Sequence, residues 1–185
     1  MNTDALFALL EAARRACGHR EFVVIGSLSV LGMEEVAAIP ADMTLSIDAD
    51  CFTPADPRRL FDLKPTLGED SPFHRKHGYY LDPVSPHLAT LPAGWRDRLI
   101  RLQRAGVVAW FLEPNDAAVS KLARGEPRDL RWVRAGLKAG LVSLPTLQLR
   151  LRDTGFLDDA EAAATRKRVD SLRSPRKRPR GTVRK

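Results

Sequence analysis

The segment Met43–Phe52, MTLSIDADCF, decides the fold because apolar and polar residues alternate along it. Successive side chains of a strand point to opposite faces of a sheet. One face of this predicted strand is therefore wholly apolar, and the other presents Ser46, Asp48 and Asp50. Two carboxylates at alternate positions lie about 6.6 Å apart at the backbone, so both can reach a single divalent cation.

A second predicted strand precedes this segment and ends in a Gly-Ser pair. The stretch EFVVIGS indicates a buried strand over Phe22–Ile25 that breaks at Gly26 into a helix starting near Ser27, a residue suited to capping it. A glycine permits close backbone approach, and a helix start offers N–H groups to phosphate. Taken alone, the pair is a strand-to-helix turn and Asp48-x-Asp50 a solvated strand face. Together they favour a phosphate and metal site.

The rest of the chain predicts an α/β (α+β) protein, with a small mixed sheet flanked by helices. Further strands are expected over 78–84 and 107–112, with prolines breaking the chain between them. Helices are expected over 3–17, 58–63, 115–124, 127–139, 145–153 and 158–172, with Thr3 and Asn115 as caps. We divide the chain into a domain over 1–140, a C-terminal helical segment over 141–172 and a disordered basic tail over 173–185.

The net charge of +7 arises in that tail. From Arg166 onward, ten Lys or Arg face one acid, which leaves 20 basic and 22 acidic residues in the rest of the chain. A tail without apolar periodicity is either a solvated extension or an arm that binds RNA or DNA. The N-terminus lacks a secretion signal, no run is apolar enough to cross a bilayer, and the two cysteines are interpreted as reduced. We therefore expect a cytoplasmic protein without a membrane partner.

Gly26-Ser27 followed by Asp48-x-Asp50 resembles the signature of the DNA polymerase β-like nucleotidyltransferase superfamily. Within it, several segments resemble a bacterial family of minimal nucleotidyltransferase-like proteins, distantly similar to AbiEii-type toxins of toxin–antitoxin systems. These segments are GSLSVLG, LSIDADCF, GEDSPFHRKHGYYLD, TLPAGWRDRL and LEPNDAAVSKLARGEPRDL. The resemblance covers roughly Glu21–Leu137.

The resemblance implies a role for each carboxylate. Asp48 and Asp50 would bind Mg²⁺. A third catalytic carboxylate is expected on the next strand, where Asp82 in YYLDP is the acid suitably placed.

The resemblance also implies a nucleotide site. Gly26 and Ser27 would hold the triphosphate of an NTP, and Lys121 would contact a phosphate as a catalytic residue. Asp129 matches a polar position that helps to order this site in the toxins. Lysines in helices are usually solvated, but the apolar neighbours of Lys121 place it at the edge of the predicted buried face.

The implied activity is Mg²⁺-dependent transfer of a nucleotidyl group from an NTP to an acceptor hydroxyl. By resemblance to the toxins, the acceptor is an RNA end such as that of tRNA, the basic tail suits such a partner, and a cognate antitoxin is a further partner. The alternative is a catalytically inactive module that binds nucleic acid or protein. Two departures bear on this choice: Thr44 stands where many relatives have a basic residue, and Glu126-Pro127-Arg128 replaces the usual Arg-Glu-Lys.

Overall fold

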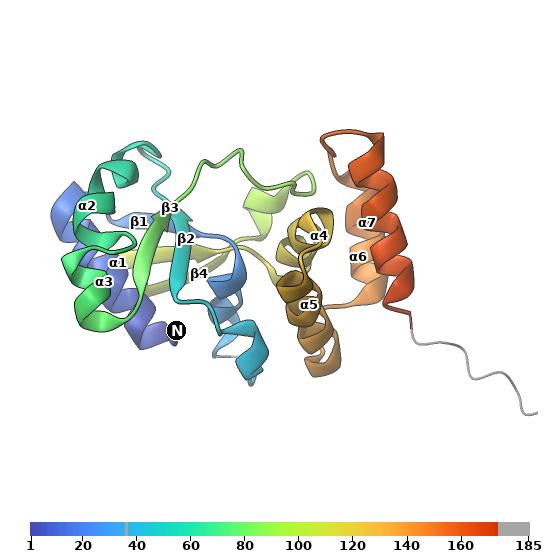
Figure 1. Cartoon of the computed structure of the whole chain (residues 1–185), viewed down its shortest axis with the longest axis horizontal. Helices are drawn as coiled ribbons and strands as arrows, with labels where there is room; N and C mark the ends of the chain where they lie inside the picture. The colour runs from blue at the N-terminus through green and yellow to red at the C-terminus, as the bar shows by residue number, and fades with distance from the viewer. Residues whose placement is uncertain (36, 174–185) are drawn as a thin grey trace, which may run out of the picture.

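A five-stranded mixed sheet forms the centre of the protein, with helices on both faces (Figure 1). The computed structural model describes residues 1–35 and 37–173. The strand order is β3-β2-β1-β5-β4, with β1 at Glu21–Val24, β2 at Asp48–Phe52, β3 at Tyr80–Pro83, β4 at Ile100–Arg104 and β5 at Val107–Phe111. The predicted α/β class with a small mixed sheet is confirmed.

The strand pairing explains why the segments quoted from the sequence lie side by side. β1 pairs antiparallel with β2 and parallel with β5, while β2 pairs parallel with β3. The end of β1, which leads into Gly26, therefore lies beside β2 with its two aspartates. β4 and β5 form an antiparallel hairpin through Ala105 and Gly106, both with positive φ.

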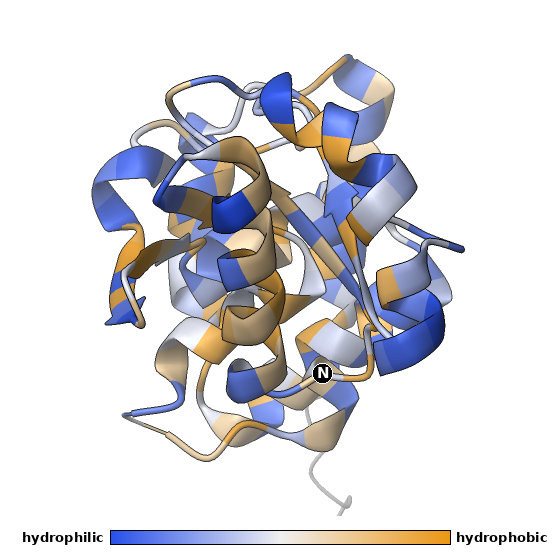
Figure 2. Ribbon diagram, turned by 90° about the vertical axis from the view of Figure 1, so that its left-hand side faces the viewer, coloured by the Kyte–Doolittle hydropathy of each residue, from blue (hydrophilic) through white to orange (hydrophobic). Residues whose placement is uncertain are grey.

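One face of the sheet is covered by the N-terminal helices, on the left in Figure 1. These are α1 (Thr3–Cys17), the 3₁₀ segment η3 (Arg59–Leu63), α2 (Lys64–Leu67) and α3 (Pro72–His77). Leu6, Leu9 and Leu10 of α1 are fully buried against this face, which presents Ala49 and Cys51 of β2. Figure 2 shows hydrophobic and hydrophilic residues interleaved along the ribbons on this side of the molecule.

The opposite face packs against the C-terminal helices. These are α4 (Pro114–Arg124), α5 (Pro127–Ala139), α6 (Leu144–Arg150), the 3₁₀ segment η5 (Leu151–Asp153) and α7 (Asp159–Ser171). Val23 and Phe52 of the sheet share one core cluster with Leu122, Leu147 and Val169 of these helices. Because side chains alternate along β2, Asp48 and Asp50 point toward this second face.

The strand predicted over 43–52 is shorter than expected, since β2 begins only at Asp48. Met43 ends a 3₁₀ segment, η2 (Ala41–Met43), and is buried, but Leu45 and Ile47 are 68% and 48% exposed. The sheet register explains the difference, because the pairing of β2 with β3 starts at Asp48 and Tyr80. Residues 44–47 have no such strand partner in the described part of the chain, so the prediction of a strand is wrong there.

Several helix starts also differ from the prediction. Asn2 rather than Thr3 caps α1, and Glu113 rather than Asn115 caps α4 by accepting from two backbone N–H groups. The segment after Gly26 is a 3₁₀ helix, η1 (Ser27–Met33), and the Ser27 side chain does not cap it. Helix starts depend on which side chain reaches the free N–H groups, which composition alone does not fix.

The elements that the sequence did not predict include strand β4, helix α3 and the 3₁₀ segment η4 (Trp95–Arg98). The predicted tail lies outside the described residues from 174 onward. None of the helices in the described part of the chain has the length and apolarity needed to span a bilayer.

Candidate active site

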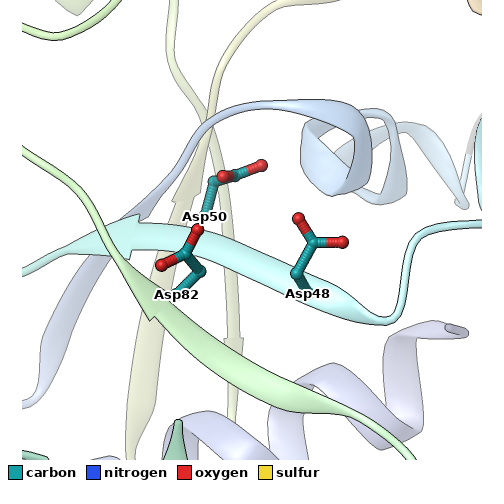
Figure 3. Close-up of side chains that lie close together, drawn as sticks. All are labelled: Asp48, Asp50 and Asp82. Carbon is teal, nitrogen blue, oxygen red and sulfur yellow. The ribbon is translucent and has the colours of Figure 1, made fainter. Parts of the chain in front are cut away.

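Three carboxylates converge on the face of the sheet that the C-terminal helices cover. Asp48 and Asp50 lie on β2, and Asp82 is the direct register partner of Asp50 on the neighbouring parallel strand β3. One oxygen of each lies within 4.8 Å of the others, and this is the one acid, His or Cys cluster with metal-site spacing among the described residues. Figure 3 shows the three side chains on the same side of the two strands, directed toward a common space.

The electrostatics of this cluster favour a cation. Burial, followed by repulsion from Asp48 and Asp82, raises the pKa of Asp50 to about 7. Burial is also the main reason that the pKa of Asp82 is raised. A bound divalent cation would stabilise the ionised carboxylates and so lower these raised pKa values. Clustered carboxylate oxygens are the ligands that Mg²⁺ prefers, so these side chains fit such an ion.

Position 26, beside the carboxylate cluster, requires a glycine because of its backbone conformation and because of its close neighbours. Its φ of +68° is in the region that side chains disfavour, and a Cβ at this position would lie 1.9 Å from Asp50 Oδ2. The backbone of the turn and the Asp50 carboxylate are therefore in direct contact. Glycine at this position leaves the room that the Asp50 carboxylate occupies against the turn.

Lys121 comes to the same turn from α4, and it is only 4% exposed. Its Nζ donates to Ser27 Oγ at 2.8 Å and to Asp129 Oδ1 at 3.4 Å. It also lies 5.0 Å from the centre of the Trp132 ring, a cation–π distance. Burial lowers the pKa of Lys121, an effect that the Asp129 carboxylate opposes. The predicted lysine is thus a buried component of the site.

Asp129 holds two cations in place. Arg124 donates to it through Nε at 2.7 Å and through Nη2 at 2.6 Å, and Lys121 completes the group. Burial raises the pKa of Asp129, but the hydrogen bonds from Arg124 and the charge of Lys121 outweigh it, so the pKa is below its ordinary value. Asp129 also caps α5 by accepting from the Glu126 N–H. The structure therefore brings all the predicted site residues to one region.

Two residues of this region were not predicted. Arg124 stands beside Asp129 and donates to both of its carboxylate oxygens. Trp132 is buried, and its Nε1 donates to the carbonyls of both Ser27 and Met43 at 3.1 Å. Arg124 follows Lys121 by about one turn of the same helix, and this spacing could have indicated that Arg124 lies near the site. Nothing in the local sequence indicates the contacts of Trp132.

Two cavities flank the Gly26–Ser27 turn. One, of about 360 Å³, includes Gly26, Asp50, Lys121 and Arg124 in its lining. Its apolar wall includes Val84, Leu88, Ala89, Leu112, Ala117 and Ala123, and its far side includes Thr90 and Glu161. The other, of about 300 Å³, contains Ser27, Asp48, Arg128 and Arg131. One cavity thus borders the carboxylate cluster at Asp50 and the other borders it at Asp48.

The mixed sheet, the three convergent carboxylates and the buried lysine beside the Gly26–Ser27 turn are consistent with the nucleotidyltransferase class. The chain belongs to the family described as nucleotidyltransferase of unknown function (DUF6036), which matches residues 4–174. The match extends beyond the segment Glu21–Leu137 and takes in α1 and the C-terminal helices. No curated protein and no solved structure matches the chain.

Proposed function

We propose that this protein is an Mg²⁺-dependent nucleotidyltransferase that moves a nucleotidyl group from an NTP to an acceptor hydroxyl. The single observation that carries the proposal is the convergence of Asp48, Asp50 and Asp82 within 4.8 Å. These carboxylates would hold the metal. Bound Mg²⁺ would supply charge neutralisation at the phosphates during transfer.

The reaction would be an in-line displacement at the α-phosphorus. The acceptor oxygen forms a new bond to that phosphorus, the bond to the bridging α–β oxygen breaks, and pyrophosphate leaves. The hydroxyl proton passes to water. Positioning and charge neutralisation provide most of the catalysis in such transfers, so the protein acts mainly by holding the reactants in place.

Lys121 and the Gly26–Ser27 turn would bind the phosphates. The Lys121 ammonium is fixed by Ser27 and Asp129, so it presents a positive charge at the turn without further ordering. The 360 Å³ cavity next to Asp50 has an apolar wall and polar ends, which suits the base and ribose of a nucleotide. Arg124, which donates to Asp129, supplies a cation beside Lys121. This cation favours an active transferase over the alternative of a catalytically inactive binding module.

We test this activity with Asp48→Asn and a labelled NTP in the presence of Mg²⁺. The variant keeps the shape of the side chain but loses the charge, so incorporation should be abolished while the fold persists. Asp62→Asn is the matched control, because Asp62 is an exposed aspartate whose one ion pair among the described residues is with Arg59. Equal incorporation by Asp48→Asn and the wild type would overturn the proposal.

On the resemblance to AbiEii-type toxins, we further propose that the acceptor is an RNA end such as that of tRNA, and that a cognate antitoxin controls the enzyme. Induced expression in a bacterial host should then arrest growth, and Asp48→Asn should relieve the arrest. Purified tRNA incubated with the enzyme and each NTP should gain nucleotides at its 3′ end. Growth arrest that persists in Asp48→Asn would contradict this role.

A further inference from the structure

The exposed face of α5 carries only positive charge. Its basic residues are Arg128, Arg131, Arg134 and Lys138, and all four are exposed. The one acid of the helix, Asp129, is buried and already engaged by Lys121 and Arg124. Among the described residues, none of the four basic side chains takes part in an ion pair. This face is therefore complementary to a polyanion.

The four cations form a continuous track. Helical geometry places Arg128, Arg131, Arg134 and Lys138 within about 120° of arc and along about 15 Å of the helix axis. That length is enough to face several phosphates of one nucleic-acid strand. Charged helix faces are often merely solvated, so the position of this track relative to the active site is what distinguishes it.

One end of the track opens into the active site. Arg128 and Arg131 line the 300 Å³ groove that also contains Ser27 and Asp48. Leu45 and Ile47, exposed at 68% and 48%, line the same groove, together with the acid Asp42. The base of the nucleotide is assigned to the cavity beside Asp50, so these apolar side chains are left for another ligand. The unpaired bases of a single strand pack against such side chains. The groove thus combines the two kinds of contact that a single strand makes.

We propose that α5 binds the acceptor as single-stranded RNA, with its phosphates along Arg134 and Arg131 and its last bases against Leu45 and Ile47. The terminal hydroxyl then reaches the carboxylates from the Asp48 side, while the nucleotide occupies the cavity on the Asp50 side. This assignment rests on the proposed transferase function and names the surface that selects its acceptor.

The test measures binding of a fluorescent single-stranded RNA to the full chain, without NTP or Mg²⁺, at several salt concentrations. The variants are the charge reversal Arg131→Glu/Arg134→Glu and the milder Arg131→Gln/Arg134→Gln, and every protein keeps the same tail. We expect the reversal to weaken binding at least about tenfold, and the Gln pair to lower the log–log salt slope by about 0.7 per lost contact. Lys76 is an exposed cation on α3, and Lys76→Glu should change neither the RNA affinity nor the salt slope.

A second measurement separates this surface from the nucleotide site. Calorimetry with NTP and Mg²⁺ should give the same affinity for the wild type and both double variants. RNA binding that is unchanged in both variants would overturn the proposal. So would a loss of NTP affinity alone, because the two arginines would then bind the nucleotide's phosphates. Absence of nucleotide incorporation by a wild type that still binds RNA through α5 would instead reject the transferase function.

Discussion

The Lys121 ammonium lies 2.8 Å from the Ser27 hydroxyl, although 94 positions separate the two residues in the sequence. This contact joins helix α4 to the turn that follows β1, and so brings a buried cation to the edge of the carboxylate cluster. The site therefore depends on the packing of the C-terminal helices against the sheet as much as on the strands themselves.

Removal of the Lys121 charge should impair catalysis more than folding. Lys121→Met keeps the length and apolar stem of the side chain, but takes away a preorganised charge at the phosphates. We expect kcat/KM for nucleotide transfer to fall about 100- to 1000-fold. Steady-state kinetics with Lys76→Met as the surface control would check this, and a loss below tenfold would exclude a role for Lys121 at the phosphates.

Substitution of Gly26 should destroy the metal site through a steric clash. In Gly26→Ala, the new Cβ would overlap the Asp50 carboxylate in addition to straining the backbone. Gly18→Ala is the control for a glycine of positive φ without a clash, because Gly18 has a φ of +79° and, among the described residues, a Cβ added there would meet no atom within 4 Å. Its ψ of −8° is in the left-handed region, whereas the ψ of −148° at Gly26 is tolerated almost only by glycine, so Gly26→Ala should lose more stability than Gly18→Ala. Both variants should lose about 1 kcal/mol or more of stability through strain. Only Gly26→Ala should lose the rise in melting temperature that Mg²⁺ gives the wild type, and retention of that rise would contradict the close contact.

The metal-free protein should become less stable as the pH rises from about 4 to about 7. The folded state keeps a proton on Asp50 up to a pKa of about 7, whereas the unfolded chain releases it near the ordinary value of 3.8. The contribution of Asp50 to the free energy of unfolding is therefore fully present below pH 4. It is lost as the pH rises through 7, and the loss amounts to up to about 4 kcal/mol. Urea unfolding in EDTA would measure it. Asp50→Asn should flatten the curve, and equal slopes in both proteins would refute the shift.

Substitution of two buried aspartates, Asp129 and Asp116, should distinguish an effect on stability from an effect on nucleotide binding. Asp129 is buried beside Lys121 and Arg124, while Asp116 is buried beside Arg98 and Arg150 and is not part of the carboxylate cluster. Asp129→Asn and Asp116→Asn each leave cations without their partner, at a cost of about 2–5 kcal/mol. Only Asp129→Asn should also weaken NTP binding by calorimetry, since it frees Lys121. Equal NTP affinities for the two variants would contradict the role of Asp129 in the site.

Local patterns predicted the parts of the site that a short segment determines. The alternation around Asp48 and Asp50 placed both on one strand face, and Gly26 marked the end of the strand beside them. The side chains that complete the site depend on long-range packing. Trp132 bridges the carbonyls of Ser27 and Met43, and no pattern around it indicates that contact.

The errors in the fold prediction have the same origin. Leu45 and Ile47 continue the alternating pattern but lie before the residue at which pairing with β3 starts, so they remain exposed. Strand β4 is an edge strand of intermediate and exposed residues, whose pairing with β5 relies on the Ala105–Gly106 turn rather than on an apolar run. Neither feature can be read from composition within a short window.

The most direct test of the central claim is a crystal structure with Mn²⁺ in place of Mg²⁺ and a non-hydrolysable NTP. The anomalous signal should show the metal bound by Asp48, Asp50 and Asp82, with the phosphates at Gly26–Ser27 and Lys121. A metal and nucleotide bound elsewhere, with the three carboxylates free of both, would contradict the account.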